Sequence, residues 1–148
     1  MYIFKVIVFL CLMMSQSLGD IIFKDDFQNP KKWKFISDQV MGGVSSGEVS
    51  YSKLNNENQA YISGNVSTKN NGGFIQIRRS LTDVNLKNAQ SIKINASGNN
   101  QEYFLHLRTK GTLLPWQYYQ LGFKVQKNFQ TYNLPIADFK RSSFFISK

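Results

Sequence analysis

Short runs in which apolar and polar residues alternate recur along this 148-residue chain, separated by turns rich in asparagine and glycine. Alternation of this kind places successive side chains on opposite faces of an extended strand. No stretch sustains the apolar period of an amphipathic helix. The alternating runs are residues 47–52, 60–66, 74–79, 91–96, 102–108, 118–125 and 129–134. With a further strand expected at residues 20–27, we predict an all-β fold of about eight or nine short strands, arranged as a β-sandwich or jelly roll.

A turn with paired glycines begins at Asp38. An apolar pair, Val40 and Met41, follows this residue and has the character of buried side chains, and Gly42 and Gly43 come directly after it. Glycine pairs at such places supply a positive φ angle or a close approach of backbone to its neighbours. We expect the Asp38 side chain to accept backbone N–H bonds and so to fix the turn.

Two further turns are expected in the first half of the chain. The polar cluster at residues 55–58 predicts a hairpin loop between the runs at 47–52 and 60–66. Gly72 and Gly73 close another turn, which leads into the run at 74–79.

The first 19 residues have the pattern of a secretory signal peptide. Lys5 precedes an apolar run at residues 6–14, and small residues follow up to Gly19, where cleavage is expected. The run is shorter than the roughly 20 residues that a membrane-spanning helix needs. We therefore predict export to the periplasm or the medium, with membrane anchoring by residues 3–14 as the alternative.

Residues 20–148 have the length of one domain and contain no internal repeat. Cys11 is the only cysteine and lies in the predicted signal peptide, so the mature chain has neither a disulfide nor a thiolate metal site. The apolar segment at residues 144–146 would begin another strand just before the chain stops at Lys148. Because proteins avoid an unpaired apolar sheet edge, we expect the domain to be incomplete at its C-terminus.

The mature chain would carry 17 basic and 9 acidic residues, a net charge of +8. Such a surplus is found in proteins that bind nucleic acid or anionic surfaces. The lysines are scattered, however, and only Lys31, Lys32 and Lys34 cluster. Scattered lysines are typical of a solvated surface. We therefore predict no nucleic-acid partner.

The residue types that catalysis needs are mostly missing. His106 is the only histidine, and no Gly-x-Ser-x-Gly sequence offers a nucleophilic serine. Asp25, Asp26 and Asp38 lack the oxygen-rich spacing of a calcium loop. Neither glycine pair is followed by the Lys-Ser/Thr of a phosphate-binding loop. We predict that the protein is not an enzyme and has no metal or cofactor; a hydrolase that uses His106 is the remaining catalytic hypothesis.

One set of aromatic and arginine residues could bind a ligand. Aromatic faces with nearby arginine donors are suited to a sugar ring or to a loop of a protein partner. Ordinary core packing and surface positions would explain the same residues. The candidate ligand-binding residues are Arg78, Arg108, Trp116 and Tyr118, together with His106.

Several of these segments together resemble the complex I intermediate-associated protein 30 family. The likeness runs from about Trp33 to Phe139. It is most specific at residues 38–45, at residues 71–74 with Arg78, and at residues 116–120. The residues that make up its structural motif are Trp33, Asp38, Met41, Gly42, Gly43, Gly72 and Gly73. The resemblance implies a galactose-binding-like jelly roll without catalytic activity, related in shape to carbohydrate-binding modules, that continues with two strands beyond Phe145.

The resemblance also implies a role. Mitochondrial members of this family are assembly factors that hold intermediates of respiratory complex I on the matrix side. The likeness therefore implies a protein partner or membrane complex, with possible peripheral contact to the membrane. Export directed by residues 1–19 would place the protein elsewhere. In that case only the fold and a general binding role carry over from the family. We predict a non-enzymatic binding module, with an exported carbohydrate-binding module and a glycan ligand as the alternative.

Overall fold

The computed structural model describes residues 20–114 and 116–142. The all-β prediction is confirmed, since these residues contain nine strands, four short 3-10 turns and no α-helix. They divide into two compact units on either side of the Asp83–Val84 bond. Within these two ranges no helix is long and apolar enough to cross a membrane. The predicted signal peptide and the C-terminal apolar segment lie outside the described residues, and the jelly-roll arrangement remains a prediction.

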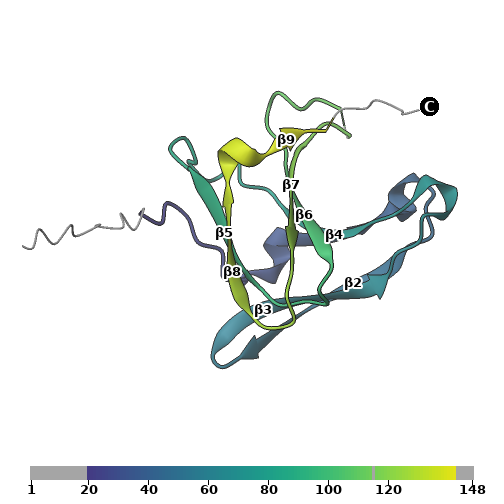
Figure 1. The fold of residues 1–148 in the computed structure, drawn as a ribbon, viewed down its shortest axis with the longest axis horizontal. Coiled ribbons are helices and arrows are strands. Elements are labelled where there is room, and N and C mark those ends of the chain that lie inside the picture. Colours follow the sequence, from purple (N-terminus) through teal and green to yellow (C-terminus); the bar gives the residue numbers. More distant parts are fainter. Residues whose placement is uncertain (1–19, 115, 143–148) are drawn as a thin grey trace, which may run out of the picture. The chain divides into compact units, whose positions relative to one another are not determined.

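The first unit consists of two antiparallel strand pairs. β1 pairs with β4, with Trp33 opposite Arg79, and β2 pairs with β3 in a hairpin (Figure 1). Turns that carry the glycine pairs lead into β2 and β4. The elements are η1 (Pro30–Lys32), β1 (Trp33–Ser37), η2 (Asp38–Met41), β2 (Ser46–Leu54), β3 (Glu57–Asn65), η3 (Lys69–Asn71) and β4 (Ile75–Arg79).

The β2–β3 hairpin has a shorter loop than the predicted one. Only Asn55 and Asn56 form the turn, with φ angles of 49° and 65°, whereas Glu57 and Asn58 belong to β3. Two central residues at positive φ match the twist of the flanking strands, and asparagine tolerates that conformation better than most residues. The prediction of a loop at residues 55–58 is therefore wrong by two residues.

The predicted strand at residues 20–27 is absent. The Asp25 carboxylate accepts a hydrogen bond from the Phe27 backbone N–H at 2.9 Å, and Phe27 has a φ of 56°. A local bond of this kind competes with strand pairing and bends the chain. The same carboxylate accepts the Trp33 indole N–H at 3.0 Å and pairs with Arg79, whose guanidinium lies 4.9 Å from the centre of the Phe23 ring. The segment is therefore fixed as a turn by its side chains.

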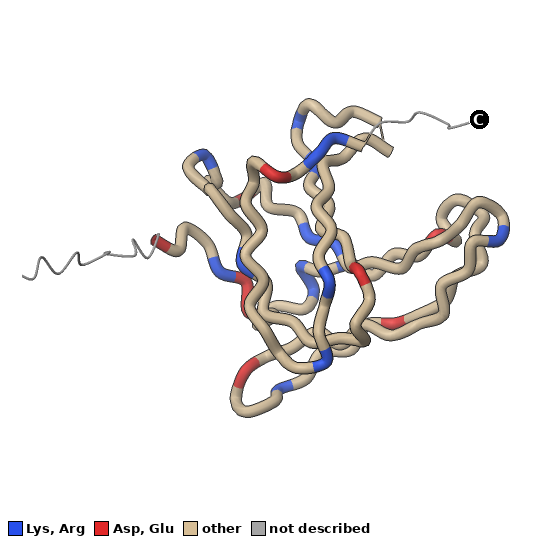
Figure 2. The backbone as a smooth tube through the Cα atoms, in the orientation of Figure 1, with Lys and Arg blue, Asp and Glu red and all other residues tan. Residues whose placement is uncertain are grey.

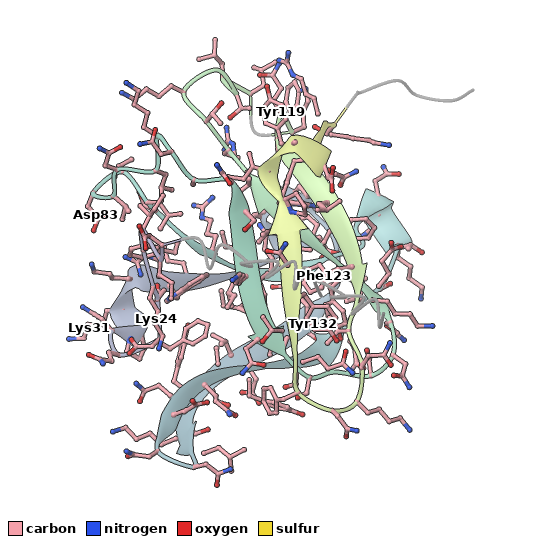
Figure 3. All side chains as sticks on the ribbon, turned by 60° about the vertical axis from the view of Figure 1, so that its left-hand side comes forward. Lys24, Lys31, Asp83, Tyr119, Phe123 and Tyr132 are labelled. Atoms are coloured by element: carbon pink, nitrogen blue, oxygen red, sulfur yellow. The ribbon has the colours of Figure 1, made fainter. Side chains whose placement is uncertain are left out.

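The second unit contains a strand pair and a three-stranded sheet. β5 pairs with β8, and β7 lies between β6 and β9, all antiparallel. The rings of Phe123 in β7 and Tyr132 in β8 are 5.3 Å apart and connect the two sheets (Figure 3). Val125 and Leu134 are the buried hydrophobic residues of the described chain. The elements are β5 (Ser91–Ala96), β6 (Glu102–Leu107), β7 (Tyr119–Lys124), β8 (Gln130–Pro135), η4 (Ile136–Asp138) and β9 (Lys140–Arg141).

Candidate functional site

The Asp38 side chain is a buried centre of hydrogen bonding in the first unit. Its residue is 0% exposed, and its carboxylate accepts bonds from the backbone N–H groups of Ser45 at 2.9 Å, Gly73 at 2.6 Å and Phe74 at 3.3 Å. The Ser45 hydroxyl donates a further bond at 2.5 Å. These bonds join the two glycine turns, since Asp38 in the first turn and Gly73 in the second are 35 residues apart in the sequence. The carboxylate accepts backbone N–H bonds, as the sequence predicts, and fixes two turns rather than one.

The glycines make room for this carboxylate. A Cβ atom on Gly43 or Gly72 would overlap the Asp38 carboxyl group. Gly42 has a different role, because it ends η2 in the left-handed region with a φ of 88° and no atom within 4 Å of an added Cβ. One glycine is therefore needed for the path of the chain, and the other two for the close approach of a side chain.

Ser45 extends the network to a third segment. While its hydroxyl donates to Asp38, it accepts the Ser67 backbone N–H at 2.9 Å. Burial by itself raises the pKa of Asp38. The hydrogen bonds from Ser45, Gly73 and Phe74 outweigh this effect and hold the pKa below its ordinary value of 3.8. The buried carboxylate is therefore ionised at neutral pH.

The turn above this network presents apolar side chains to solvent. Val40 is 76% exposed and Met41 65%, so the prediction that this pair is buried is wrong. The interior position is taken by Asp38, whose polar atoms are all paired there. Gln39 donates its side-chain N–H to the Ser45 carbonyl at 2.8 Å and helps to close the turn. Exposed Val44 completes the set. We call Val40, Met41 and Val44 the apolar turn.

The candidate ligand-binding residues lie in different units. Arg78 is an exposed residue of β4 in the first unit, opposite Lys34 in β1. Arg108, Trp116 and Tyr118 belong to the second unit. Arg108 donates from Nη2 to the backbone carbonyls of Thr112 and Leu114, at 3.0 and 3.1 Å. The half-exposed Trp116 accepts the Ser142 hydroxyl at its carbonyl, 2.9 Å away.

His106 stacks on one of these residues. Its ring lies 4.2 Å from that of Tyr118, with an angle of 17° between the planes. Partial burial lowers the pKa of His106 below 6.5, and a hydrogen bond with the Gln120 side chain opposes that effect. Among the residues that the structure describes, no three His, Cys, Asp or Glu side chains form a group that could hold a metal ion. The geometry of His106 is that of an aromatic stacking partner.

A second polar centre surrounds Asp25 in the first unit. The side chains of Asp25 and Arg79 are 16% and 7% exposed and neutralise each other. They lie beside an open depression of about 240 Å³. Trp33 contributes its indole N–H to this centre, which is a structural role for that motif residue. The sequence analysis missed the participation of Asp25, Arg79 and Ser45, although Ser45 lies in the most specific part of the family resemblance.

A comparison with known protein families identifies the family of this chain. A family model described as Complex I intermediate-associated protein 30 matches residues 22–144. The chain belongs to the complex I intermediate-associated protein 30 family. A search among curated proteins found no significant match. The matched residues include the Asp38 network and the apolar turn, and the family is one of assembly factors rather than a known enzyme family.

We predict that Gly43→Ala destabilises this family member more than Gly42→Ala does. At position 43 the methyl group displaces the Asp38 carboxylate and leaves buried N–H donors unpaired, at about 1–3 kcal/mol for each donor. At position 42 the cost is only the left-handed backbone conformation, about 1–2 kcal/mol. Urea unfolding of both variants measures the difference. Equal losses, or a greater loss for Gly42→Ala, would contradict the assigned roles.

A second prediction concerns acid. Because the folded pKa of Asp38 lies below 3.8, its ionised form adds stability that is complete above that value and is lost as the pH falls through the folded pKa. Ser45→Ala removes one bond that lowers this pKa. We expect it to cost about 2 kcal/mol at neutral pH and to flatten the loss of stability in acid. Urea titrations of the wild type, Ser45→Ala and the exposed control Ser46→Ala test this, and parallel pH curves for all three would refute it.

Proposed function

We propose that the protein is a non-enzymatic binding module that holds a protein partner during the assembly of a membrane protein complex. Membership of an assembly-factor family supports the general role. The observation that carries the proposal is the apolar turn, in which three neighbouring aliphatic side chains point to solvent. The turn lies where the chain enters β2, toward the right-hand side of Figure 1.

The apolar turn differs from scattered surface hydrophobics. Single exposed aliphatic residues are common, but a group of them in one turn marks an interaction surface. The Asp38 network keeps this group outside, because turning it inward would break the buried bonds to Ser45 and Gly73. Asn70 adds a bond from its side-chain N–H to the Gly42 carbonyl at 3.2 Å.

The same rigidity favours binding. A surface that is already ordered loses little conformational entropy when a partner binds, so more of the contact energy appears as affinity. Methionine is enriched in the buried centres of protein interfaces and adapts its shape to an apolar groove. Met41 is therefore the residue we expect to contribute most to the contact.

We predict that Met41→Asp weakens partner binding at least about tenfold, the loss expected when a central interface residue is removed. Leu54→Asp is the matched control, because Leu54 is also exposed and lies at the far end of β2. The measurement is the recovery of membrane-complex subunits, quantified by mass spectrometry, after affinity capture from membrane extracts. Failure of the wild type to enrich such subunits, or equal losses for the two variants, would count against the proposal.

Carbohydrate binding is the second candidate function. It is supported by the stacked rings of His106 and Tyr118 and by half-exposed Trp116 in the same unit. Aromatic faces of this kind pack against the apolar side of a sugar ring.

If the module binds glycans, Trp116→Ala should lower the affinity about tenfold or more, which corresponds to the burial of a large aromatic surface. A glycan array identifies a ligand, and titration of that ligand against the wild type and Trp116→Ala gives the ratio of affinities. An array on which the wild type binds nothing, or an unchanged affinity of the variant, eliminates this candidate.

A further inference from the structure

The loop between β6 and β7 exposes a second apolar group, distinct from the apolar turn. Leu113 is 83% exposed, the highest value among the large hydrophobic residues of the described chain, and Leu114 and Trp116 are also exposed. We call Leu113, Leu114 and Trp116 the apolar tip. Isolated exposed leucines need no explanation, but two leucines and a tryptophan in one loop do.

The loop is held open by its own hydrogen bonds. At its base, Arg108 donates to the carbonyls of Thr112 and Leu114. Thr112 is buried, and its hydroxyl donates to the Thr109 carbonyl at 2.7 Å. Gln117 accepts the Leu114 N–H at 3.2 Å and donates its own backbone N–H to the Leu114 carbonyl at 3.0 Å. These polar groups therefore bond to one another within the loop, while the leucine side chains are exposed to solvent.

This internal pairing matters for the environment that the loop can enter. A backbone group that loses water without gaining a partner costs free energy, and the cost is greatest in a lipid environment. In this loop the carbonyls of Thr112 and Leu114 already have donors. The tip can therefore leave water at lower cost than an irregular loop without such bonds.

The unit that carries the loop is strongly basic. Residues 84–148 contain nine lysines and arginines but only two acidic residues, Glu102 and Asp138. None of the cations described between Val84 and Ser142 forms an ion pair. In contrast, residues 20–83 contain eight basic and seven acidic residues. The scattered lysines of the sequence are therefore unequally divided, and nearly all of the surplus charge belongs to the second unit.

Cations lie next to the apolar tip. Lys110 belongs to the loop itself, and β9 supplies Lys140 and Arg141 (Figure 2). Ser142, which directly follows β9, connects this strand to the end of the loop. Its backbone N–H donates to the Tyr118 carbonyl at 2.8 Å, and the Ser142 hydroxyl donates to the Trp116 carbonyl. The apolar tip is therefore flanked by positive charge from two neighbouring elements.

We propose that the β6–β7 loop docks on the surface of an anionic lipid bilayer. Leu113 and Leu114 enter the boundary between headgroups and acyl chains, Trp116 lies at the level of the headgroups, and Lys110 together with the cations of β9 supplies positive charge near the lipid phosphates. Aliphatic and tryptophan side chains beside lysine and arginine are the combination that anionic membrane surfaces attract. This inference does not depend on the proposed protein partner, since it concerns lipid and a different loop.

Vesicle binding by the full chain tests the proposal. We expect the wild type to bind vesicles that contain phosphatidylglycerol and to bind pure phosphatidylcholine vesicles much more weakly. Leu113→Ser should weaken binding about tenfold, and Lys110→Gln about fivefold, from the lost apolar area and one lost charge. Leu54→Ser and Lys53→Gln change the same residue types at the end of β2 and should bind like the wild type. The N-terminal apolar run is common to all variants, so differences between them report on the loop.

Fluorescence gives a local readout. Trp33 and Trp116 are the two tryptophans of the chain. Brominated acyl chains should quench the emission of Trp116, and Trp116→Phe should abolish that quenching. Equal binding by Leu113→Ser and Leu54→Ser, no preference for the anionic vesicles, or no quenching of Trp116 would each overturn the proposal. A Leu113→Ser variant that no longer binds a glycan or protein ligand but binds vesicles as the wild type does would also overturn it. Met41→Asp should leave vesicle binding intact, so failure of this proposal is distinguishable from failure of the proposed function.

Discussion

A single buried carboxylate organises the first unit of this protein. Asp38 is taken out of water together with its charge, which is costly unless hydrogen-bond donors replace the lost hydration. The donors come from Ser45, Gly73 and Phe74, so the chain before β2 and the chain before β4 must meet around one side chain. Gly43 and Gly72 are required because no larger residue leaves space for that meeting. The glycine pairs are thus a consequence of the buried charge.

The two loops proposed as binding surfaces share one physical arrangement. Each loop contains a buried polar residue that is hydrogen-bonded, Asp38 in the first unit and Thr112 in the second. In both loops the aliphatic side chains are exposed to solvent. This reverses the usual distribution of polar and apolar groups. It is stable because every inward polar group named has a partner, so burial does not leave an unpaired donor or acceptor. Two such loops in different units would let one small module contact a protein and a lipid surface independently.

Much of the fold could be predicted, because the signals for it are local. Alternation of side chains marks the strands, an asparagine-rich cluster marks the β2–β3 turn to within two residues, and the Asp38 segment carries the family resemblance that the comparison confirmed. The missing first strand shows where local signals fail, because there a side chain changed the path of the backbone. Asp25 replaces a strand with a turn through its bond to Phe27 and its pairing with Arg79, a residue 54 positions away. No local pattern in residues 20–27 contains that partner.

The sequence by itself determined the all-β class, the positions of the glycine turns, the excess of positive charge and the family, because strand alternation and turn chemistry act over a few residues. The tertiary structure decided which side chains are buried. Val40 and Met41 are apolar residues of the kind found in protein cores, yet both are exposed to solvent. Asp38 is a charged residue of the kind found on protein surfaces, yet it is buried. It also decided that the surplus charge belongs to the unit with the apolar tip. Whether a side chain is buried depends on the atoms that distant segments of the chain place around it. Those segments come together only when the chain has folded.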